Sequence, residues 1–306
     1  MQHLSTLFDL SADDVMDILE TAESLKEQHT AGTGTTPLEN RVATLVFEKP
    51  SLRTRLSFEA AMAHLGGSAS FFSGNDAGLY GRESLPDIAR VISGYSDVVV
   101  LRTFSQELIN EFCEWSSCPV INGLSDEYHP CQALTDLFTI REHFGALTDE
   151  KLVFVGDGNN VSASLALLTS MAGLPMTLAC PSGYELPDEF LDRLRELCPD
   201  SQFTQTNDPR DAVKDADIVY TDVWASMGQE EEEEKRKKDF ADFQVTAELL
   251  ALTPSRCRFM HDLPAKRGLE VTDDAMEHSK SIVFQQAENR MHLAKGLLTW
   301  IITRAN

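Results

Sequence analysis

The chain has 306 residues, more than one compact domain usually needs, so its length favours two lobes. With 42% hydrophobic and 25% charged residues it has the composition of a globular protein, and no apolar run approaches the roughly 20 residues of a membrane span. The net charge of −23 argues against nucleic acid or anionic lipid as a partner, because a polyanion would be repelled. An anionic substrate would need a local positive pocket.

The sequence that follows Met1 has neither the basic nor the apolar region of a signal peptide, and we expect a cytoplasmic protein. The six cysteines are scattered, without a CxxC pair or the spacing of zinc ligands. We therefore expect free thiols, no metal site and no disulfide framework.

Helical and strand-like patterns alternate along the chain. In the first half, helical spacing is expected over 12–27, 56–65, 85–92, 106–115 and 132–144, and strand-like runs over 41–47, 69–72, 97–101 and 120–121. In the second half, strands are expected over 151–155, 176–179 and 218–220, and helices over 162–171 and 188–197. Such alternation predicts an α/β fold of two lobes, each a mostly parallel sheet flanked by helices. The charge block over 230–238 is expected to form a solvated helix with Glu-to-Lys pairs.

Two groups of polar residues in the first half suit an anionic, carbonyl-containing ligand. Ser51-Leu52-Arg53-Thr54 stands where a strand passes into a helix, so backbone N–H groups, hydroxyls and a guanidinium could hold a phosphate. The alternative is a capped, exposed helix start. Further along, His129 and Gln132 lie three apart near a helix start, where they could polarise a carbonyl and bind a planar group, unless His129 is merely structural.

Three segments of the second half also carry polar residues at strand ends. Gly156-Asp-Gly-Asn-Asn160 resembles a dinucleotide-binding turn, but Val161 replaces the third glycine, and paired asparagines suit an amino-acid head group instead. Asp222 could pair with an ammonium group or only cap a helix. His261-Asp262-Leu263-Pro264 follows an apolar run, and we expect an extended turn there that exposes carbonyl groups. Arg290 stands at the expected start of the final helix.

Together these segments resemble one family. SxRTR near residue 51, GRESLPD near 81, HPxQ near 129, GDGNN near 156, DVWxSMGQE near 222, HxLP near 261 and QAENR near 286 have the order and spacing of the aspartate/ornithine carbamoyltransferases. The resemblance covers essentially the whole chain, and GDGNN with the SMG loop resembles the ornithine branch. It implies an enzyme without metal or organic cofactor that transfers a carbamoyl group from carbamoyl phosphate to the side-chain amine of ornithine, giving citrulline and phosphate.

The resemblance also implies a division of labour along the chain. Residues 1–135 with 290–306 would bind carbamoyl phosphate, the last helix returning to the first lobe, and residues 150–285 would bind the amino acid. Members of the family are usually trimers, so we expect a homotrimer or a multiple of one, with small-molecule substrates and no nucleic acid or membrane partner. The carbamoyl phosphate site would comprise Ser51, the N–H of Leu52, Arg53, Thr54, Arg102, His129, Gln132, the carbonyl of Leu263 and Arg290. The ornithine site would comprise Asn160, Asp222, Ser226 and the backbone of Met227.

One position departs from the family pattern. The ornithine enzymes usually have His-Cys-Leu-Pro where this chain has Asp262 in place of the cysteine that lies beside the attacking amine. We expect Asp262 to act with Arg102, His129 and Arg290 as a catalytic residue, either with ornithine at an altered pH dependence or with another amine such as lysine, putrescine or N-acetylornithine. Two rivals remain: a non-catalytic carbamoyl phosphate-binding relative, and a nucleotide-dependent oxidoreductase built on Gly156 and Gly158.

Overall fold

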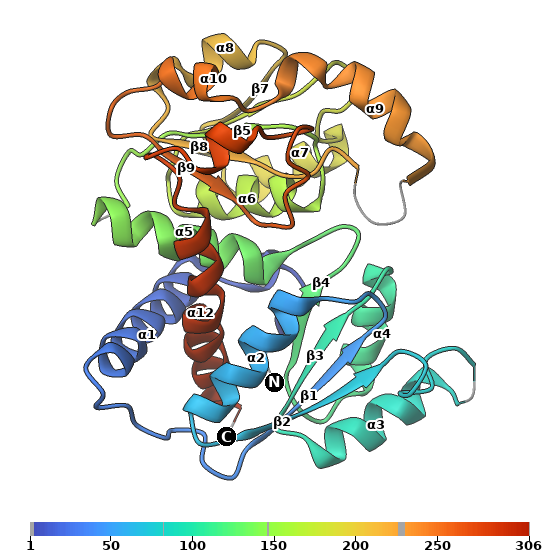
Figure 1. Ribbon diagram of the computed structural model, residues 1–306. Helices are drawn as coiled ribbons and strands as arrows, with labels where there is room; N and C mark the ends of the chain where they lie inside the picture. Colours follow the sequence, from blue (N-terminus) through green and yellow to red (C-terminus); the bar gives the residue numbers. More distant parts are fainter. Residues whose placement is uncertain (1–2, 82, 146, 226–229, 306) are drawn as a thin grey trace. The chain divides into compact units, whose positions relative to one another are not determined.

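The computed structural model describes residues 3–81, 83–145, 147–225 and 230–305. The chain divides into two compact units (Figure 1): unit 1 comprises Met1–Phe138 and Glu288–Asn306, and unit 2 comprises Thr139–Ala287. In the described ranges, the structure contains no helix that is both long and apolar enough to span a bilayer. All six cysteines are free thiols, as the sequence predicts.

Unit 1 is a four-stranded parallel sheet of order β2-β1-β3-β4 with helices around it (Figure 1). Its strands are β1 (Val42–Phe47), β2 (Ser68–Ser73), β3 (Val98–Arg102) and β4 (Val120–Leu124). Its helices are η1 (Leu7–Asp9), α1 (Ala12–Thr30), α2 (Leu52–His64), α3 (Leu85–Tyr95), α4 (Gln106–Trp115), the first part of α5 (Pro130–Phe144) and most of α12 (Val283–Arg304). The core between β1, β3 and α3–α4 consists of aliphatic and aromatic side chains such as Val99, Leu101 and Phe112.

Unit 2 is a five-stranded parallel sheet of order β7-β6-β5-β8-β9. Its strands are β5 (Leu152–Val155), β6 (Met176–Ala179), β7 (Phe203–Thr206), β8 (Ile218–Thr221) and β9 (Arg258–His261). Its helices include α6 (Asn160–Met171), α7 (Asp188–Leu197), α8 (Pro209–Ala212), η2 (Val213–Asp215), η3 (Glu230–Glu232), α9 (Glu233–Asp239), η4 (Ala241–Phe243), α10 (Ala247–Ala251) and α11 (Asp273–Met276). The predicted class, two parallel sheets flanked by helices, is confirmed.

Local chemistry sets several helix starts. Ser11 accepts from the N–H of Asp14 and forms a capping box with it. Ser84 caps α3 and Ser105 caps α4, and each of these side chains accepts from one backbone N–H. On α1 the positions Val15, Ile18, Leu19, Ala22 and Leu25 are buried, which matches the helical spacing read from the sequence.

Four expectations differ from the structure. The final helix begins at Val283, before the expected region around Arg290, and the strand β7 was not predicted because Phe203–Thr206 is short and mostly polar. In the charge block, the first three residues form the 3-10 turn η3, and Arg236 of α9 is buried rather than solvated because it pairs with Asp157. The turn at Leu263 is not extended: its φ is 60° and the Leu263–Pro264 peptide is cis.

Candidate functional site

Both sheets have a point at which the strand order reverses, and the polar residues of interest follow the strands there. In unit 1, β1 lies between β2 and β3, and Phe47 at its carboxyl end pairs with Arg102 of β3. In unit 2, β5 lies between β6 and β8. Ligands of open parallel sheets bind beyond the carboxyl ends of strands at such reversals. The topology therefore predicts one ligand-binding region in each unit.

The segment that follows β1 forms the amino end of α2. Ser51 is the N-cap residue, and its Oγ accepts from the N–H of Thr54 at 3.2 Å. Leu52 begins the helix with its side chain 70% exposed, while Thr54 is buried. The remaining N–H groups of this first turn have no carbonyl partner within the helix and carry its positive dipole end, which suits an anion. Arg53 follows Leu52 on the same turn.

Two buried arginines meet Thr54. Arg102 donates from Nη1 to Thr54 Oγ1 at 3.5 Å, and Arg290 donates from Nη2 to the same oxygen at 3.3 Å. Arg290 also donates from Nη1 to Oε1 of Gln132 at 3.0 Å, and Nε2 of Gln132 donates to Asp136 at 2.8 Å. Unit 1 thus brings together side chains that are 236 residues apart, and Arg290 donates to two uncharged acceptors, Thr54 and Gln132.

His129 lies in the same group and is kept neutral. Burial lowers the pKa of His129 well below its ordinary value, and the positive charges of Arg290, Arg102 and Arg53 lower it further. A neutral imidazole with three guanidiniums around it can donate a hydrogen bond to a carbonyl oxygen without adding another charge. The structure therefore brings together Thr54, Arg102, His129, Gln132 and Arg290, as the sequence predicts.

In unit 2, the β5–α6 turn meets the end of β8. Asn159 is the N-cap residue of α6, accepting from the N–H groups of Val161 and Ser162 at 3.0 Å each. Its Nδ2 donates to Oδ2 of Asp222 at 2.8 Å, and the N–H of Val223 donates to Oδ1 of Asp222 at 2.6 Å. Asp222 is therefore a buried acceptor at the strand end and not a helix cap.

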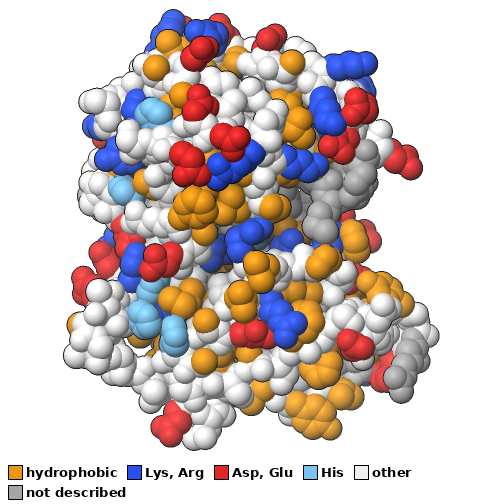
Figure 2. All heavy atoms as spheres, in the orientation of Figure 1, with side chains coloured by type: hydrophobic (Ala, Val, Ile, Leu, Met, Phe, Trp, Pro, Cys, Tyr) orange, Lys and Arg blue, Asp and Glu red, His pale blue; other side chains and the backbone are white. Residues whose placement is uncertain are grey.

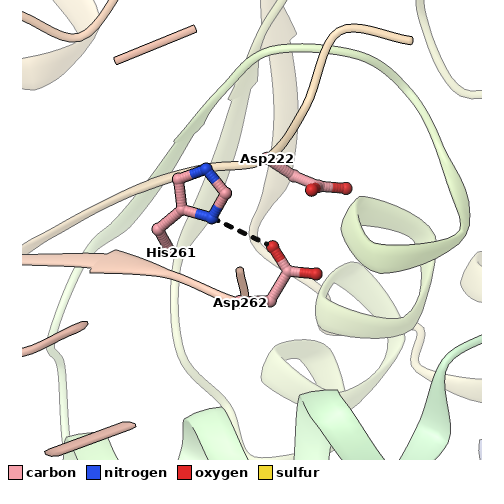
Figure 3. A group of neighbouring side chains, drawn as sticks. All are labelled: Asp222, His261 and Asp262. Carbon is pink, nitrogen blue, oxygen red and sulfur yellow. Dashed lines mark ion pairs between the residues drawn. The ribbon is translucent and has the colours of Figure 1, made fainter. Parts of the chain in front are cut away.

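A second carboxyl group lies beside Asp222 (Figure 3). Thr221 and His261 are paired across β8 and β9, so the residues that follow them, Asp222 and Asp262, leave the sheet side by side. One oxygen of each carboxyl group and one ring nitrogen of His261 all lie within 4.8 Å of one another. Burial raises the pKa of Asp222 well above its ordinary value, and the negative charge of Asp262 raises it further.

Both nitrogens of His261 are already engaged. Nδ1 accepts from the N–H of Leu263 at 2.9 Å, and Nε2 lies 3.2 Å from Oε1 of the buried Glu270. Burial lowers the pKa of His261, but hydrogen bonding to Asp262 and Glu270 outweighs it and raises the pKa to about 9. In the observed geometry Nδ1 accepts from Leu263, so the ring proton lies on Nε2. The second proton that this pKa favours would exchange the Leu263 bond at Nδ1 for a bond to Asp262, 3.3 Å away.

Leu263 adopts a backbone conformation that leucine rarely takes, with φ at 60°. The backbone N–H of Leu263 donates to Nδ1 of His261. The backbone N–H of His261 donates to Oε1 of Gln286 at 2.9 Å. Gln286 in turn donates to the hydroxyl of Tyr220 at 3.1 Å. Strain of this kind persists where the surroundings fix the backbone, and it is typical of functional sites.

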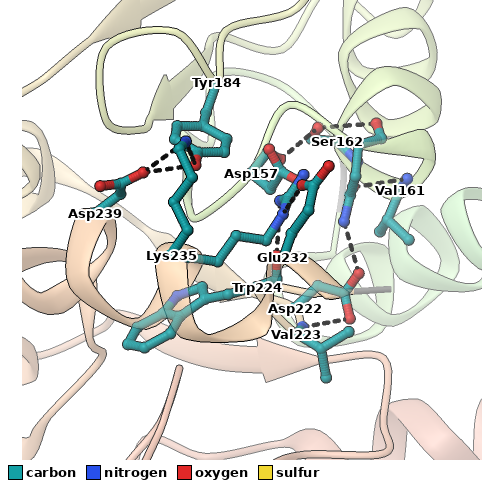
Figure 4. Close-up of polar contacts among 12 residues, drawn as sticks. Asp157, Val161, Ser162, Tyr184, Asp222, Val223, Trp224, Glu232, Lys235 and Asp239 are labelled. Carbon is teal, nitrogen blue, oxygen red and sulfur yellow. Dashed lines mark hydrogen bonds and ion pairs between the residues drawn. The ribbon is translucent and has the colours of Figure 1, made fainter. Parts of the chain in front are cut away.

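A buried ion pair fixes the segment that follows β8 (Figure 4). Nη1 of Arg236 donates to Asp157 at 2.5 Å and to the carbonyl of Trp224 at 2.7 Å, and its Nε donates to Glu232 at 2.9 Å. Arg236 thereby joins the β5–α6 turn to both sides of residues 226–229. The expected ornithine ligands Ser226 and Met227 lie outside the described residues.

The Gly158 position explains why the sequence resembles a dinucleotide-binding turn. A Cβ at this position would lie 2.6 Å from the carbonyl oxygen of Tyr184 and 2.7 Å from the carbonyl carbon of Glu185. The N–H of Gly158 donates to the same Tyr184 oxygen at 2.8 Å. Glycine is needed here for close backbone packing within unit 2, and this need accounts for it without a pyrophosphate.

Sequence reasoning missed some of the residues that build this region. Asn160, expected to bind ornithine, is the half-buried first residue of α6, whereas its neighbour Asn159 contacts Asp222. Glu270 and Arg236 were not singled out, because a lone glutamate and a charge block carry no signal of burial. Gln286 falls within the QAENR segment, so a signal was present.

The comparisons with known proteins agree along the whole chain. Residues 2–142 match the model of the aspartate/ornithine carbamoyltransferase carbamoyl-P binding domain, and residues 148–301 match that of the Asp/Orn binding domain. The chain belongs to this family. The resemblance read from the sequence motifs is therefore confirmed, and the oxidoreductase interpretation of Gly156 and Gly158 is not favoured.

Relatives within the family are similar over nearly their full length. An ornithine carbamoyltransferase of Archaeoglobus fulgidus is 45% identical over 298 residues, 97% of this chain and 96% of the relative, and one of Methanosarcina mazei is 43% identical over 293 residues, 96% of each. Among solved structures, the ornithine carbamoyltransferase of Pyrococcus furiosus is 43% identical with a TM-score of 0.95, covering 99% of this chain and 97% of that one.

Proposed function

We propose that this protein transfers the carbamoyl group of carbamoyl phosphate to the side-chain amine of ornithine, giving citrulline and phosphate. The observation that supports this most is the group of Thr54, Arg102, His129 and Arg290 in unit 1, which combines buried positive charge with a neutral imidazole. The relatives that match nearly the whole chain are named ornithine carbamoyltransferases.

Carbamoyl phosphate has an anionic end and a carbonyl end, and unit 1 offers partners for both. The first turn of α2, with Ser51, the N–H of Leu52, Arg53 and Thr54, would hold the phosphate. Arg102, His129 and Arg290 would donate to the carbonyl oxygen, on which negative charge grows as the amine attacks. Oε1 of Gln132 would accept from the carbamoyl NH2.

In unit 2, Asn160 and Asp222, together with Ser226 and Met227 of the following loop, would bind the α-amino and carboxylate groups of ornithine. Carboxyl groups near the ends of β8 and β9 suit a substrate with ammonium groups. Aspartate as acceptor would need cationic side chains for its second carboxylate, and the sequence of the 222–229 loop contains none.

The first experiment is a comparison of acceptors. Purified protein is incubated with carbamoyl phosphate and, separately, ornithine, N-acetylornithine, lysine, putrescine or aspartate, and phosphate and carbamoylated product are measured from mildly acidic to alkaline pH. Citrulline formed with ornithine alone would support the proposal. Product with another amine alone would reassign the acceptor, and no product with any amine would favour a non-catalytic carbamoyl phosphate-binding protein.

A variant then tests the role of the buried arginines. Arg290→Met should lower kcat by about 10²–10³-fold, because one preorganised donor to the developing oxyanion is lost. Arg90→Met is the matched control: Arg90 lies in the same unit but is about half exposed and contacts Asp87 and the ring of Trp115. Equal activity of the two variants would contradict the assigned role.

We further propose that residues 1–135 with 290–306 bind carbamoyl phosphate and residues 150–285 bind the amino acid. Support comes from the two family models and from the separate compact units that the chain forms. We also propose a cytoplasmic location, because all six cysteines are free thiols and free thiols persist in a reducing compartment.

A homotrimer, or a multiple of one, is the assembly we propose. Large apolar side chains are exposed on unit 1, where Figure 2 shows hydrophobic side chains over α2: Leu52 is 70% and Leu56 54% exposed, and Phe72 on the edge strand β2 is 42% exposed. Contiguous exposed apolar surface is typical of subunit interfaces. Light scattering coupled to gel filtration would give the mass of the assembly, and Leu56→Glu should lower it.

A further inference from the structure

Three histidines and two lysines of unit 1 gather where three helices meet. They are Lys26 and His29 of α1, His64 at the end of α2, and His292 and Lys295 of α12, and we call them the His–Lys cluster. The ring of His29 stacks on that of His64 with the centroids 4.7 Å apart, and it meets the ring of His292 edge-on at 5.5 Å. Figure 2 shows histidine side chains gathered on one part of unit 1. Segments near both ends of the chain thus build one basic feature.

Close packing of α1 against α12 fixes the buried part of the cluster. A Cβ on Gly296 would lie 2.7 Å from the Cβ and N of Ala22, so the two helices approach closely at this glycine. Next to it, Nζ of Lys295 donates to the carbonyl oxygen of Leu25 at 3.3 Å. His292 lies one helical turn before Gly296, so it is on the same face of α12. The packing therefore directs both bases of α12 toward α1.

Two members of the cluster are buried without the partners that buried polar groups need. His292 and Lys295 are each 2% exposed. Nδ1 of His292 has no hydrogen-bond partner among the described residues, and its Nε2 lies 3.8 Å from Glu288, too far for a hydrogen bond. Within the described part of the chain, Lys295 forms no ion pair, and it donates to the carbonyl of Leu25. Buried lysines are almost always paired, and an ammonium group has three protons to donate.

The electrostatic balance of the cluster favours an additional negative charge. The charged and titratable groups that face His292 are Lys26 and His29 of α1, His64 of α2, and Glu288 and Lys295 of α12. Burial, and then the positive charges of Lys295 and Lys26, lower the pKa of His292 to about 3. Burial and then the charge of Lys26 also lower the pKa of Lys295. Glu288 is 66% exposed, so its charge is well screened. An anion at the cluster would relieve the repulsion among the bases.

We propose that the His–Lys cluster is a binding site for an oxyanion with two negative charges, namely free phosphate or the phosphate group of a small metabolite. The anion would accept from the ammonium group of Lys295 and from Nδ1 of His292, which supply the missing acceptor for each. The exposed rings of His29 and His64 would add donors from the solvent side. This inference does not depend on the proposed carbamoyl transfer.

The cluster is separate from the group that we assign to carbamoyl phosphate. Arg290 belongs to that group and donates to Thr54. His292 is two residues further along α12, and side chains two apart on a helix do not face each other. The two sets of bases therefore lie on different faces of the same helix.

An anion fits the cluster better than a metal ion does. The rings of His29 and His64 are stacked at an interplanar angle of 26°, so they present faces and not nitrogen atoms to each other. A metal ion needs ligand atoms that converge on one point. The ammonium groups of Lys26 and Lys295 would also repel a cation.

The melting temperature measured with different anions tests the site. Sodium sulfate, sodium phosphate, glycerol 3-phosphate and sodium chloride are compared at equal ionic strength, from about pH 5.5 to about pH 8. Sulfate keeps both charges over this range, so its pH dependence reports the protein. Bound sulfate would raise the pKa of His64, which burial, His29 and Lys295 lower, so we expect its Kd to fall about tenfold as the pH decreases. A lower Kd for glycerol 3-phosphate than for phosphate would indicate an ester, and the reverse would indicate free phosphate.

Variants separate binding at the cluster from the general stabilisation that sulfate gives to proteins by exclusion. Lys295→Met should raise the Kd for sulfate at least about tenfold, because a charge-assisted hydrogen bond is lost. Without sulfate it should melt at the same temperature or higher, because a buried unpaired charge is gone. His64→Gln changes an exposed side chain and should raise the Kd at the acidic end of the range alone. Lys214→Met, at an exposed ion pair with Asp211 in unit 2, is the matched control and should change neither quantity.

The KM for carbamoyl phosphate locates the anion. It should stay within about twofold in Lys295→Met, and a rise that accompanies the loss of sulfate binding would overturn the proposal by placing the anion at the start of α2. Equal effects of sulfate in Lys295→Met, His64→Gln and Lys214→Met would overturn it too, and so would an effect of sulfate no larger than that of chloride. If the protein transfers no carbamoyl group, the proposed function fails, while the melting temperatures still decide whether the cluster binds an anion.

Discussion

The buried pair of Arg236 and Asp157 offers a sharp test of how unit 2 holds the segment after β8. Both side chains are less than 10% exposed, and Arg236 also holds the carbonyl of Trp224. Arg236→Met would leave the Asp157 carboxylate buried without its partner, which typically costs about 3–5 kcal/mol. Asp157 can escape by taking a proton, since burial already raises its pKa. Proton uptake at pH 7 by an acid of ordinary pKa about 3.9 costs about 4 kcal/mol, so we expect a loss of about 3–4 kcal/mol.

Urea unfolding gives the free energy of unfolding, and steady-state kinetics with ornithine as acceptor give KM and kcat for the same variant. Lys237→Met is the matched control, because Lys237 lies next to Arg236 on α9 but makes its ion pairs with Glu233 and Glu234 at the surface. We expect it to cost less than about 1 kcal/mol. The double variant with Asp157→Asn should regain part of the lost stability, since no uncompensated charge remains. Equal losses in Arg236→Met and Lys237→Met would refute this account of the pair.

Two other perturbations have signs that follow from unit 1. A Cβ on Gly296 would lie 2.7 Å from the Cβ and N of Ala22, so Gly296→Ala should destabilise the protein by about 2 kcal/mol although alanine has the better helix propensity. The space around Gly94 is open, so Gly94→Ala should stabilise the protein by about 0.5–1 kcal/mol. The urea unfolding assay measures both changes. Burial, then Lys295 and Lys26, lower the pKa of His292 to about 3. As the pH falls, the unfolded chain therefore binds a proton on His292 before the folded chain does. The contribution of neutral His292 to the free energy of unfolding is fully present above about pH 6.5 and falls below that pH by up to about 1.4 kcal/mol per pH unit. His292→Gln should flatten this slope when unfolding is measured from pH 4 to 7.

The sequence predicted those features that repeat along the chain. Alternating periodicity gave the strands and helices, because burial on one face or two leaves a regular pattern. The region of Thr54, Arg102 and His129 could be predicted since each follows or ends a strand and since strand ends in a parallel sheet meet at one edge. The family motifs then assigned roles that spacing alone left open.

What could not be predicted depends on contacts between distant segments. Arg236 looks like any residue of a charged surface helix, and only the fold places it beside Asp157. Leu263 has a φ of 60°, and its backbone N–H donates to the ring of His261, whose backbone N–H donates to Gln286. A Leu-Pro dipeptide in the sequence reveals neither hydrogen bond. Burial that depends on partners far along the chain leaves no local pattern to read.

The two units use the same topology to create opposite electrostatic environments. In unit 1, Thr54 follows β1 and Arg102 ends β3, and Arg290 joins them, so positive charge and hydrogen-bond donors collect at that sheet edge. After β8 and β9 of unit 2 come Asp222 and Asp262, so that edge collects acceptors. A net charge of −23 therefore does not prevent an anionic substrate from binding, because a local field from buried arginines is screened less than the surface charges are. A substrate pair with one anionic and one cationic member is what this division of charge fits, and carbamoyl phosphate and ornithine have these charges.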